Sequence, residues 1–164
     1  MVTLIIILVV LASVVVDFLF FMWWFKRLRV QAIEDMRKMV GGERVYNVED
    51  SNCFGVLSKG YKQVRGNGVL ALTDKGIHSR MLIPRKYLFI HLESVRGVSN
   101  PRSFLGKTKA RVLLRVDFVN EEGQDDACAW LVPSLQWWNE AVAALRMGKE
   151  PPPAPWSKKG GVSL

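Results

Sequence analysis

The chain has 164 residues, enough for about one domain of ordinary size. Apolar residues make up 49% of it and charged residues 23%, which is too apolar for a disordered chain, and two cysteines are too few for a scaffold held together by disulfides. The net charge of +8 indicates an anionic partner surface, and because so apolar an average is unusual beside so much charge, the two must be concentrated in different parts of the chain.

The apolar residues are concentrated at the N-terminus, where the 24 residues from Val2 to Phe25 contain one formal charge. A helix of this length spans roughly 36 Å, more than the ~30 Å hydrocarbon core of a bilayer. Trp23 and Trp24 come near the end of the run and Lys26 follows it, as in an aromatic belt with a basic cytoplasmic flank. A cleaved signal peptide would need a basic start, a shorter apolar run and small residues at its end. The pattern therefore predicts one transmembrane helix over residues 1–25, with the N-terminus outside and the bulk of the chain in the cytoplasm.

Asp17 is the one charged residue inside the predicted span, on the order of 12 Å from its C-terminal end. A central aspartate costs ~2.5–3.5 kcal/mol on insertion scales, which the many aliphatic residues outweigh. Two interpretations stay open. Asp17 is either protonated or locally hydrated without a role, or it contacts a polar group on a partner helix and supports assembly.

Residues 26–42 are predicted to extend this helix into the cytoplasm. They contain good helix formers without proline, and Gly41-Gly42 is typical of a helix C-terminus. Apolar residues recur at approximate helical spacing, at Leu28, Ala32, Met36 and Met39. A helix lying on the membrane surface is the alternative, although the apolar face is thin for that role.

From residue 43 onward the apolar residues alternate with polar ones, which is typical of strands. Asn67-Gly68 is a strong hairpin signal, and Thr73–Gly76 and Asn120–Gly123 indicate further turns. The predicted strands include Val69–Thr73, Ile77–Ile83, Tyr87–Leu92, Arg111–Asn120 and Asp125–Leu131. Together these signals predict about six or seven short strands in a domain over residues 43–148.

A helix is predicted to close the domain, with Ser134 as its N-cap and Gly148 as its end. Its buried stripe is predicted at Leu135, Trp138, Val142 and Leu145. Trp137 is displaced by one residue and is expected at the margin of the stripe, partly exposed. Residues 149–164 begin with a proline-rich run and are predicted to be a disordered tail, with a role as a proline-rich ligand as the alternative.

Three segments resemble bacterial domains of the pleckstrin-homology superfold, of the PH-like and GRAM-like type. Gly68–Ile77 resembles their G-x-L-x-L-T-x-x-G-I/L hairpin, and His91–Val98 resembles their I/H-L-x-x-I-x-x-V segment. Trp130–Leu145 resembles their last strand together with a helix that contains an inward tryptophan. The resemblance covers about residues 43–147. It implies a mainly β fold, a strongly bent and partly open barrel of about seven antiparallel strands, plugged at one end by a C-terminal helix.

The resemblance implies less about function. Members of the superfold bind phosphoinositides, other lipids, peptides or partner proteins, and many serve as assembly modules. Lipid-binding members have a basic signature around the first hairpin; Lys59, Lys62 and Arg65 lie there, but no R-x-R follows on the next strand. The resemblance also implies a place at the cell inner membrane, the plasma membrane of a bacterium.

No arrangement of residues indicates an enzyme, a cofactor or a metal site. Gly66–Ala71 fits a dinucleotide-binding pattern, but a strand follows where that motif needs a helix. Gly106-Lys107-Thr108 matches the end of a P-loop without its first glycine, so we expect a basic hairpin loop. The two histidines and two cysteines lack zinc-ligand spacing, and the cysteines are expected to be buried and inert. Asp125-Asp126 follows a turn and is expected to be solvated.

The charge is unevenly distributed along the chain. Residues 57–115 contain thirteen basic and two acidic residues, net +11, and residues 116–150 contain two basic and seven acidic residues, net −5. Eight basic residues in predicted loops are free to face lipid headgroups: Lys59, Lys62, Arg65, Arg85, Lys86, Arg102, Lys107 and Lys109. A solvated basic surface without a ligand is the alternative. Nucleic acid is not predicted as a partner, because the aromatic residues are placed in the core rather than on an exposed sheet.

These observations lead to two hypotheses for the function. The first is a membrane-anchored cytoplasmic adaptor or assembly module, not an enzyme, whose PH-like domain docks on anionic lipid or on a membrane-protein partner. The alternative is a structural subunit of a membrane complex, held through its transmembrane helix and Asp17, with no lipid ligand. Salt-sensitive binding to anionic vesicles would favour the first.

Overall fold

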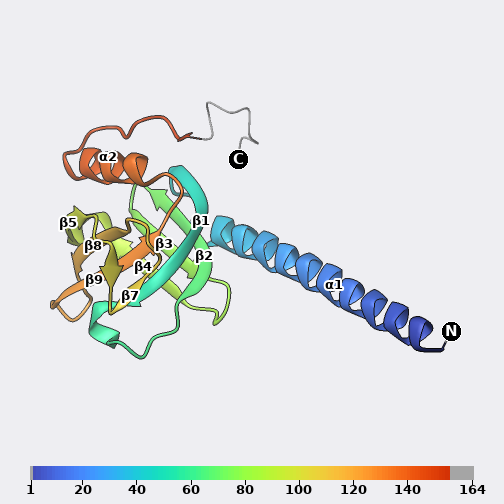
Figure 1. Ribbon diagram of the computed structural model, residues 1–164. Helices are drawn as coiled ribbons and strands as arrows, with labels where there is room; N and C mark the ends of the chain where they lie inside the picture. Colours follow the sequence, from blue (N-terminus) through green and yellow to red (C-terminus); the bar gives the residue numbers. More distant parts are fainter. Residues whose placement is uncertain (1, 156–164) are drawn as a thin grey trace.

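The computed structural model describes residues 2–155, without the side chains at positions 2, 4, 5, 8 and 9 (Figure 1). The two helices described are α1 (Val2–Met39) and α2 (Leu135–Arg146). The longer strands are β1 (Val45–Val56), β2 (Gly66–Thr73), β3 (Gly76–Met81), β4 (Tyr87–His91), β5 (Val95–Ser99), β8 (Leu114–Val119) and β9 (Asp125–Leu131). Shorter elements are β6 (Ser103–Phe104), β7 (Lys107–Thr108), and the 3-10 turns η1 (Leu57–Lys59) and η2 (Leu92–Ser94).

Seven antiparallel strands form one sheet in the order β4-β3-β2-β1-β9-β8-β5. β4 and β5 are its two edges, yet Ile90 of β4 and Val95 of β5 belong to the same buried cluster. The sheet therefore bends around a shared core rather than lying flat (Figure 1). The predicted mainly β fold, with seven antiparallel strands and a C-terminal helix, is confirmed.

The helix α2 covers one end of the bent sheet and completes its core (Figure 1). Trp138 and Val142 lie one helical turn apart and are fully buried, as the apolar stripe predicts. The indole Nε1 of Trp138 donates a hydrogen bond to Glu49 of β1. The indole Nε1 of Trp130 in β9 donates to Ser79 Oγ of β3 at 2.9 Å. Both buried indoles thus have a partner for their N–H group and connect different strands through the core.

The last turns of α1 pack on the outer face of the sheet. Ala32, Met36 and Val40 recur every four residues and so lie on one face of the helix. They are buried against Val69 and Ala71 of β2. The helix is continuous from this contact back to its first turn, and its N-terminal part projects away from the β domain with its described apolar side chains exposed (Figure 1).

The prediction of a transmembrane helix is wrong. Across the residues that the structure describes, no helix is apolar over a stretch long enough to cross a membrane. The predicted span contains the carboxylate of Asp17 and is followed directly by Lys26. The single-pass orientation deduced from the predicted span is not retained.

Two expectations about the C-terminal helix need correction. Ser134 occupies the N-cap position, but its side chain makes no capping hydrogen bond with the described residues. Trp137 is buried rather than partly exposed, because the chain after α2 folds back over it and its Nε1 donates to Pro152 O at 3.0 Å. The proline-rich segment therefore packs on α2, and the disorder predicted for residues 156–164 lies outside the described residues.

Candidate functional site

Two loops lie at the end of the sheet opposite α2, and the hairpin of a third loop reaches them (Figure 1). The first, residues 57–65, connects β1 to β2 and includes η1. The second, residues 82–86, connects β3 to β4. The third, residues 100–113, connects β5 to β8. It starts beside α2, where the Asn100 and Asn139 side chains bond to each other, and its β6–β7 hairpin extends to the first loop. We call these three loops together the loop end.

Contacts between the loops hold the loop end together. The ammonium group of Lys107 donates hydrogen bonds to Phe54 O at 3.3 Å and to Gln63 O. Arg65 Nη1 donates to Thr108 O at 3.4 Å, so the first and third loops are joined twice. The second loop lies against the start of β2, where a Cβ added to Gly66 would be 2.9 Å from Ile83 O. Residues far apart in the sequence therefore form one surface.

Polar side chains shape the first loop from within. The amide nitrogen of Gln63 donates to Val56 O at 2.6 Å and Gly60 O at 2.7 Å, while its oxygen accepts from the Val56 N–H at 3.0 Å. Asp126 accepts from the backbone N–H and the hydroxyl of Ser58, at 2.9 and 2.6 Å. Asp126 is buried, so the expectation that it is solvated is wrong. These bonds give hydrogen-bond partners to polar groups of the loop that would otherwise need water as a partner.

Most of the predicted binding residues are exposed on these three loops. The exposed ones are Lys59, Lys62, Arg65, Arg85, Lys86, Arg102 and Lys109. The Arg65 guanidinium also stands 5.4 Å from the centre of the Phe54 ring. Lys107 differs, because it is partly buried and bonded to two carbonyl groups, which makes it a support for the loops rather than a ligand-facing cation. Asp17 is exposed in the projecting part of α1 rather than on these loops.

The loop end also exposes large apolar side chains that were not predicted as binding residues. Tyr61 and Val64 in the first loop are 74% and 67% exposed, and Ile83 in the second loop is 49% exposed. Several such residues on neighbouring loops form a surface of the kind that binds a partner or a membrane. A signal for the first two was present in the sequence, since Tyr61 and Val64 stand within a lysine-rich loop where no core position is expected.

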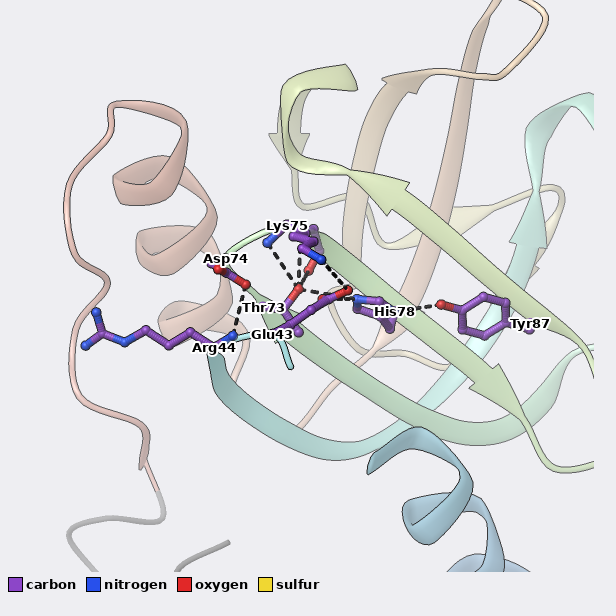
Figure 2. A network of polar contacts seen from close by, with 8 residues as sticks. Glu43, Arg44, Thr73, Asp74, Lys75, His78 and Tyr87 are labelled. Atoms are coloured by element: carbon purple, nitrogen blue, oxygen red, sulfur yellow. Dashed lines mark hydrogen bonds and ion pairs between the residues drawn. The ribbon is translucent and has the colours of Figure 1, made fainter. Parts of the chain in front are cut away.

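A second cluster of polar residues lies on the outer face of the sheet, where α1 ends (Figure 2). His78 Nε2 is 2.9 Å from Glu43 Oε2 and 3.3 Å from Thr73 Oγ1, and His78 Nδ1 is 2.7 Å from the Tyr87 hydroxyl. A nucleophile–histidine–carboxylate triad would place the nucleophile and the carboxylate on different ring nitrogens. Here Thr73 and Glu43 share one nitrogen, and Thr73 is fully buried. The cluster therefore joins the turn after α1 to β2, β3 and β4 as a structural network.

The electrostatics of this network fit a neutral histidine that donates to a carboxylate. Burial lowers the pKa of His78 below its ordinary value, although the hydrogen bond and charge of Glu43 act to raise it. Burial acts to raise the pKa of Glu43, but hydrogen bonds to Thr73 and His78 and the charge of Lys75 outweigh it, so the pKa lies below its ordinary value. Burial raises the pKa of Tyr87, which keeps its hydroxyl protonated and able to donate to His78 Nδ1.

Acid is expected to destabilise the fold through this network. The unfolded chain binds a proton at His78 near pH 6.5, above the pH at which the folded chain does, so the free energy of unfolding should fall below about pH 6.5. At lower pH Glu43 acts in the same direction, because its lowered pKa stabilises the fold only while the carboxylate is ionised. His78→Gln should reduce the fall in Tm between pH 7 and pH 5, and the control His91→Gln, at an exposed position, should preserve it. Identical pH profiles for His78→Gln and the unchanged chain would count against this role.

The remaining candidate groups have structural surroundings. Cys53 and Cys128 are free and buried, with their Sγ atoms 3.9 Å apart. The hydrogen bond to Cys128 lowers the pKa of Cys53, against burial, whereas burial raises the pKa of Cys128 well above its ordinary value. Neither thiol has the exposure of a reactive cysteine. Within residues 2–155, no group of three or more His, Cys, Asp or Glu side chains could hold a metal ion.

Comparisons with known proteins bear on the fold. No family model matches the chain, and no curated protein matches it. Among solved structures, a similar one is the crystal structure of the C-terminal domain of an unknown protein from Leishmania infantum, which is 9% identical with a TM-score of 0.50. The match covers 70% of this chain and 94% of that one. At such low identity the likeness concerns the fold alone, so the function has to be argued from the surface of this chain.

Proposed function

We propose that the β domain is a docking module that binds an anionic lipid surface through its loop end, and that it acts there as an adaptor rather than as an enzyme. The observation that supports this most is the exposure of Tyr61, Val64 and Ile83 on loops that also expose Lys62 and Arg85. Apolar tips among cations suit a lipid interface, because the tips can enter the acyl boundary while the cations stay with the headgroups.

Charge magnitudes favour a particular orientation of the domain. Each basic residue near an anionic leaflet contributes about 1 kcal/mol, and the attraction decays within ~8–10 Å at physiological salt. The turn after β8 contains Glu121 and Glu122, and it lies beside the first loop because Asp126, just after it, bonds to Ser58. This acidic edge would be repelled by the leaflet. We expect residues 60–65 and 82–86 to face the surface and the acidic turn to be tilted away from it.

Membership of the pleckstrin-homology superfold is part of the same proposal. It is supported by the bent sheet of seven antiparallel strands, by the helix that closes one end of it and by the buried Trp138 of that helix. The cations are spread over three loops instead of following the basic signature of phosphoinositide-binding members. A general anionic surface is therefore a better candidate ligand than one specific headgroup.

The projecting part of α1 adds apolar surface for such an association. Its exposed side chains include Phe18, Phe20 and Trp23, each more than half exposed. A contiguous apolar surface of this kind marks a site of interaction in a folded protein. The alternative function, a structural subunit held through a membrane-spanning helix, is not retained because the described residues contain no such helix.

Co-sedimentation of the full chain with vesicles tests the proposal. Lys62→Glu/Arg85→Glu is expected to weaken binding to phosphatidylglycerol vesicles at least about tenfold, because two attractive charges become repulsive. The control Arg96→Glu/Arg146→Glu reverses two exposed charges on β5 and α2 and should bind like the unchanged chain. Equal effects of the two variants, or equal binding of the unchanged chain to phosphatidylcholine vesicles, would rule out docking through the charged loop end.

A further inference from the structure

A groove of about 830 Å³ lies between α1 and the sheet, where the helix leaves the β domain. The helix contributes Met22, Trp23 and Phe25 to its lining, and the end of β9 and the residues after it contribute Leu131 and Pro133. The volume is within the roughly 300–1,000 Å³ that is usual for small-molecule sites. Five apolar side chains from two separate elements thus face the same space.

The groove follows from the way α1 is attached. The helix packs on β2 through Ala32 and Met36, and one turn further back Arg29 forms an ion pair with Asp50 of β1. Beyond Arg29, toward its N-terminus, the helix departs from the sheet (Figure 1), and the space between them is left open. The strands β1 and β2 beneath it are each paired on both sides, so they offer no free edge to which a peptide strand could add.

The charges lining the groove favour an anion. Lys26, Arg29 and Arg111 line it, with Asp50 as the one carboxylate. Asp50 is already paired with Arg29, which leaves Lys26 and Arg111 without an ion-pair partner among the described residues. The amide oxygen of Asn52, in the same lining, has no hydrogen-bond partner in the described part of the chain. The groove therefore combines apolar side chains with two cations available to a ligand.

We propose that this groove holds one anionic phospholipid molecule, with an acyl chain along Met22, Phe25 and Leu131 and its phosphate bound by Lys26 and Arg111. An acyl chain matches the apolar part of the lining, to which Met22, Phe25 and Leu131 contribute. A phosphate supplies the charge that the two cations lack, and charge-assisted hydrogen bonds to arginine are the strong ones. This site goes beyond the docking surface, because Lys26 and Arg111 are not among residues 60–65 and 82–86, which are expected to face the leaflet.

Fluorescence quenching in mixed micelles tests the site with the full chain. In a Trp24→Phe background, Trp23 is the tryptophan that lines the groove, and phosphatidylglycerol with brominated acyl chains should quench it at low lipid-to-protein ratio. Brominated phosphatidylcholine should require a higher concentration. Lys26→Gln/Arg111→Gln should raise the half-quenching concentration for phosphatidylglycerol about tenfold, because the phosphate loses both cations. Both side chains are exposed, so this variant is expected to keep the Tm of the unchanged chain.

The loop-end variant Lys62→Glu/Arg85→Glu is the matched control. It should be quenched like the unchanged chain even if it no longer sediments with vesicles, so failure of the groove and failure of the docking surface are distinguishable. Equal quenching by the two brominated lipids, or no effect of Lys26→Gln/Arg111→Gln, would overturn the proposal. Inorganic phosphate that shifts Trp23 fluorescence as strongly as the lipid would replace it with a phosphate site. A peptide retained in place of lipid in native mass spectra would replace it with a peptide groove.

Discussion

Trp138→Ala is expected to lower the free energy of unfolding by about 3–5 kcal/mol, a large fraction of the stability of an ordinary domain. Trp138 is fully buried in the main core, where α2 packs over one end of the bent sheet. Truncation removes an indole from the buried cluster that also contains the fully buried Trp130 and Leu114. A core packed to this density cannot collapse into the space, so the cavity adds to the loss of apolar burial. Urea unfolding followed by circular dichroism measures the change.

The polar part of this effect can be separated from the packing. The Trp138 N–H donates to Glu49, and burial raises the pKa of that carboxyl, although the hydrogen bonds that it accepts act to lower it. Trp138→Phe keeps a ring in the core but removes the donor, and it should cost about 1–3 kcal/mol. Trp24→Ala, at a position that is 42% exposed on α1, is the control and should be close to neutral. A loss below about 1 kcal/mol in Trp138→Ala would contradict a structural role for α2 in the core.

The elements that the sequence predicted correctly are those with a local signal. The alternation in β8 and β9 and the helical stripe of α2 depend on burial of one face, which the residue pattern records directly. The pattern predicts a turn at Asn67-Gly68, whereas both residues lie within β2. Gly68 is needed there for a different reason, since a Cβ would lie 2.3 Å from Arg80 O on the neighbouring strand. A glycine is needed both in a tight turn and where two strands approach closely, so its presence in the sequence does not distinguish the two.

The central strand β1 was not predicted as a strand, because its polar residues find partners far away in the sequence. Asp50 pairs with Arg29 of α1, and Glu49 accepts from Trp138 of α2. Without knowledge of those partners, the mostly polar residues from Asn47 to Asn52 indicate a loop. Different elements cover the two faces of β1, so its apolar and polar residues do not alternate. Alternation therefore could not identify β1 as a strand.

The candidate site was predictable in its charge and not in its shape. Net charge by segment indicates which loops are basic, and most of those side chains are exposed in the structure. That three loops meet, with Tyr61, Val64 and Ile83 at their tips, depends on the order of strands in the sheet, which no local signal encodes. Lys107 shows the same limit, because its sequence context resembles that of the other lysines while its ammonium group is bonded to two backbone carbonyls.

Gly76→Ala is expected to destabilise the fold by about 1–3 kcal/mol or more through overpacking at the start of β3. A Cβ added at this position would lie 2.1 Å from Ile90 O and 2.9 Å from the Phe89 ring. The carbonyl belongs to the backbone of β4, which is hydrogen-bonded to β3 along its length, so it cannot move away without breaking the ladder. Gly97→Ala on β5 is the matched control, because no described atom lies within 4 Å of its added Cβ, and it should be neutral or slightly stabilising.

The comparison of Gly76→Ala with Gly97→Ala also bears on function. β3 and β4 are the strands that hold residues 82–86, the second loop of the loop end. If the β3–β4 ladder positions Ile83 and Arg85, Gly76→Ala should weaken binding to anionic vesicles under conditions where the variant remains folded, and Gly97→Ala should not. A Gly76→Ala variant that unfolds at the same urea concentration as Gly97→Ala would contradict the close approach of the strands. Loss of stability without loss of vesicle binding would show that the second loop keeps its position through its contact with Gly66 rather than through the ladder.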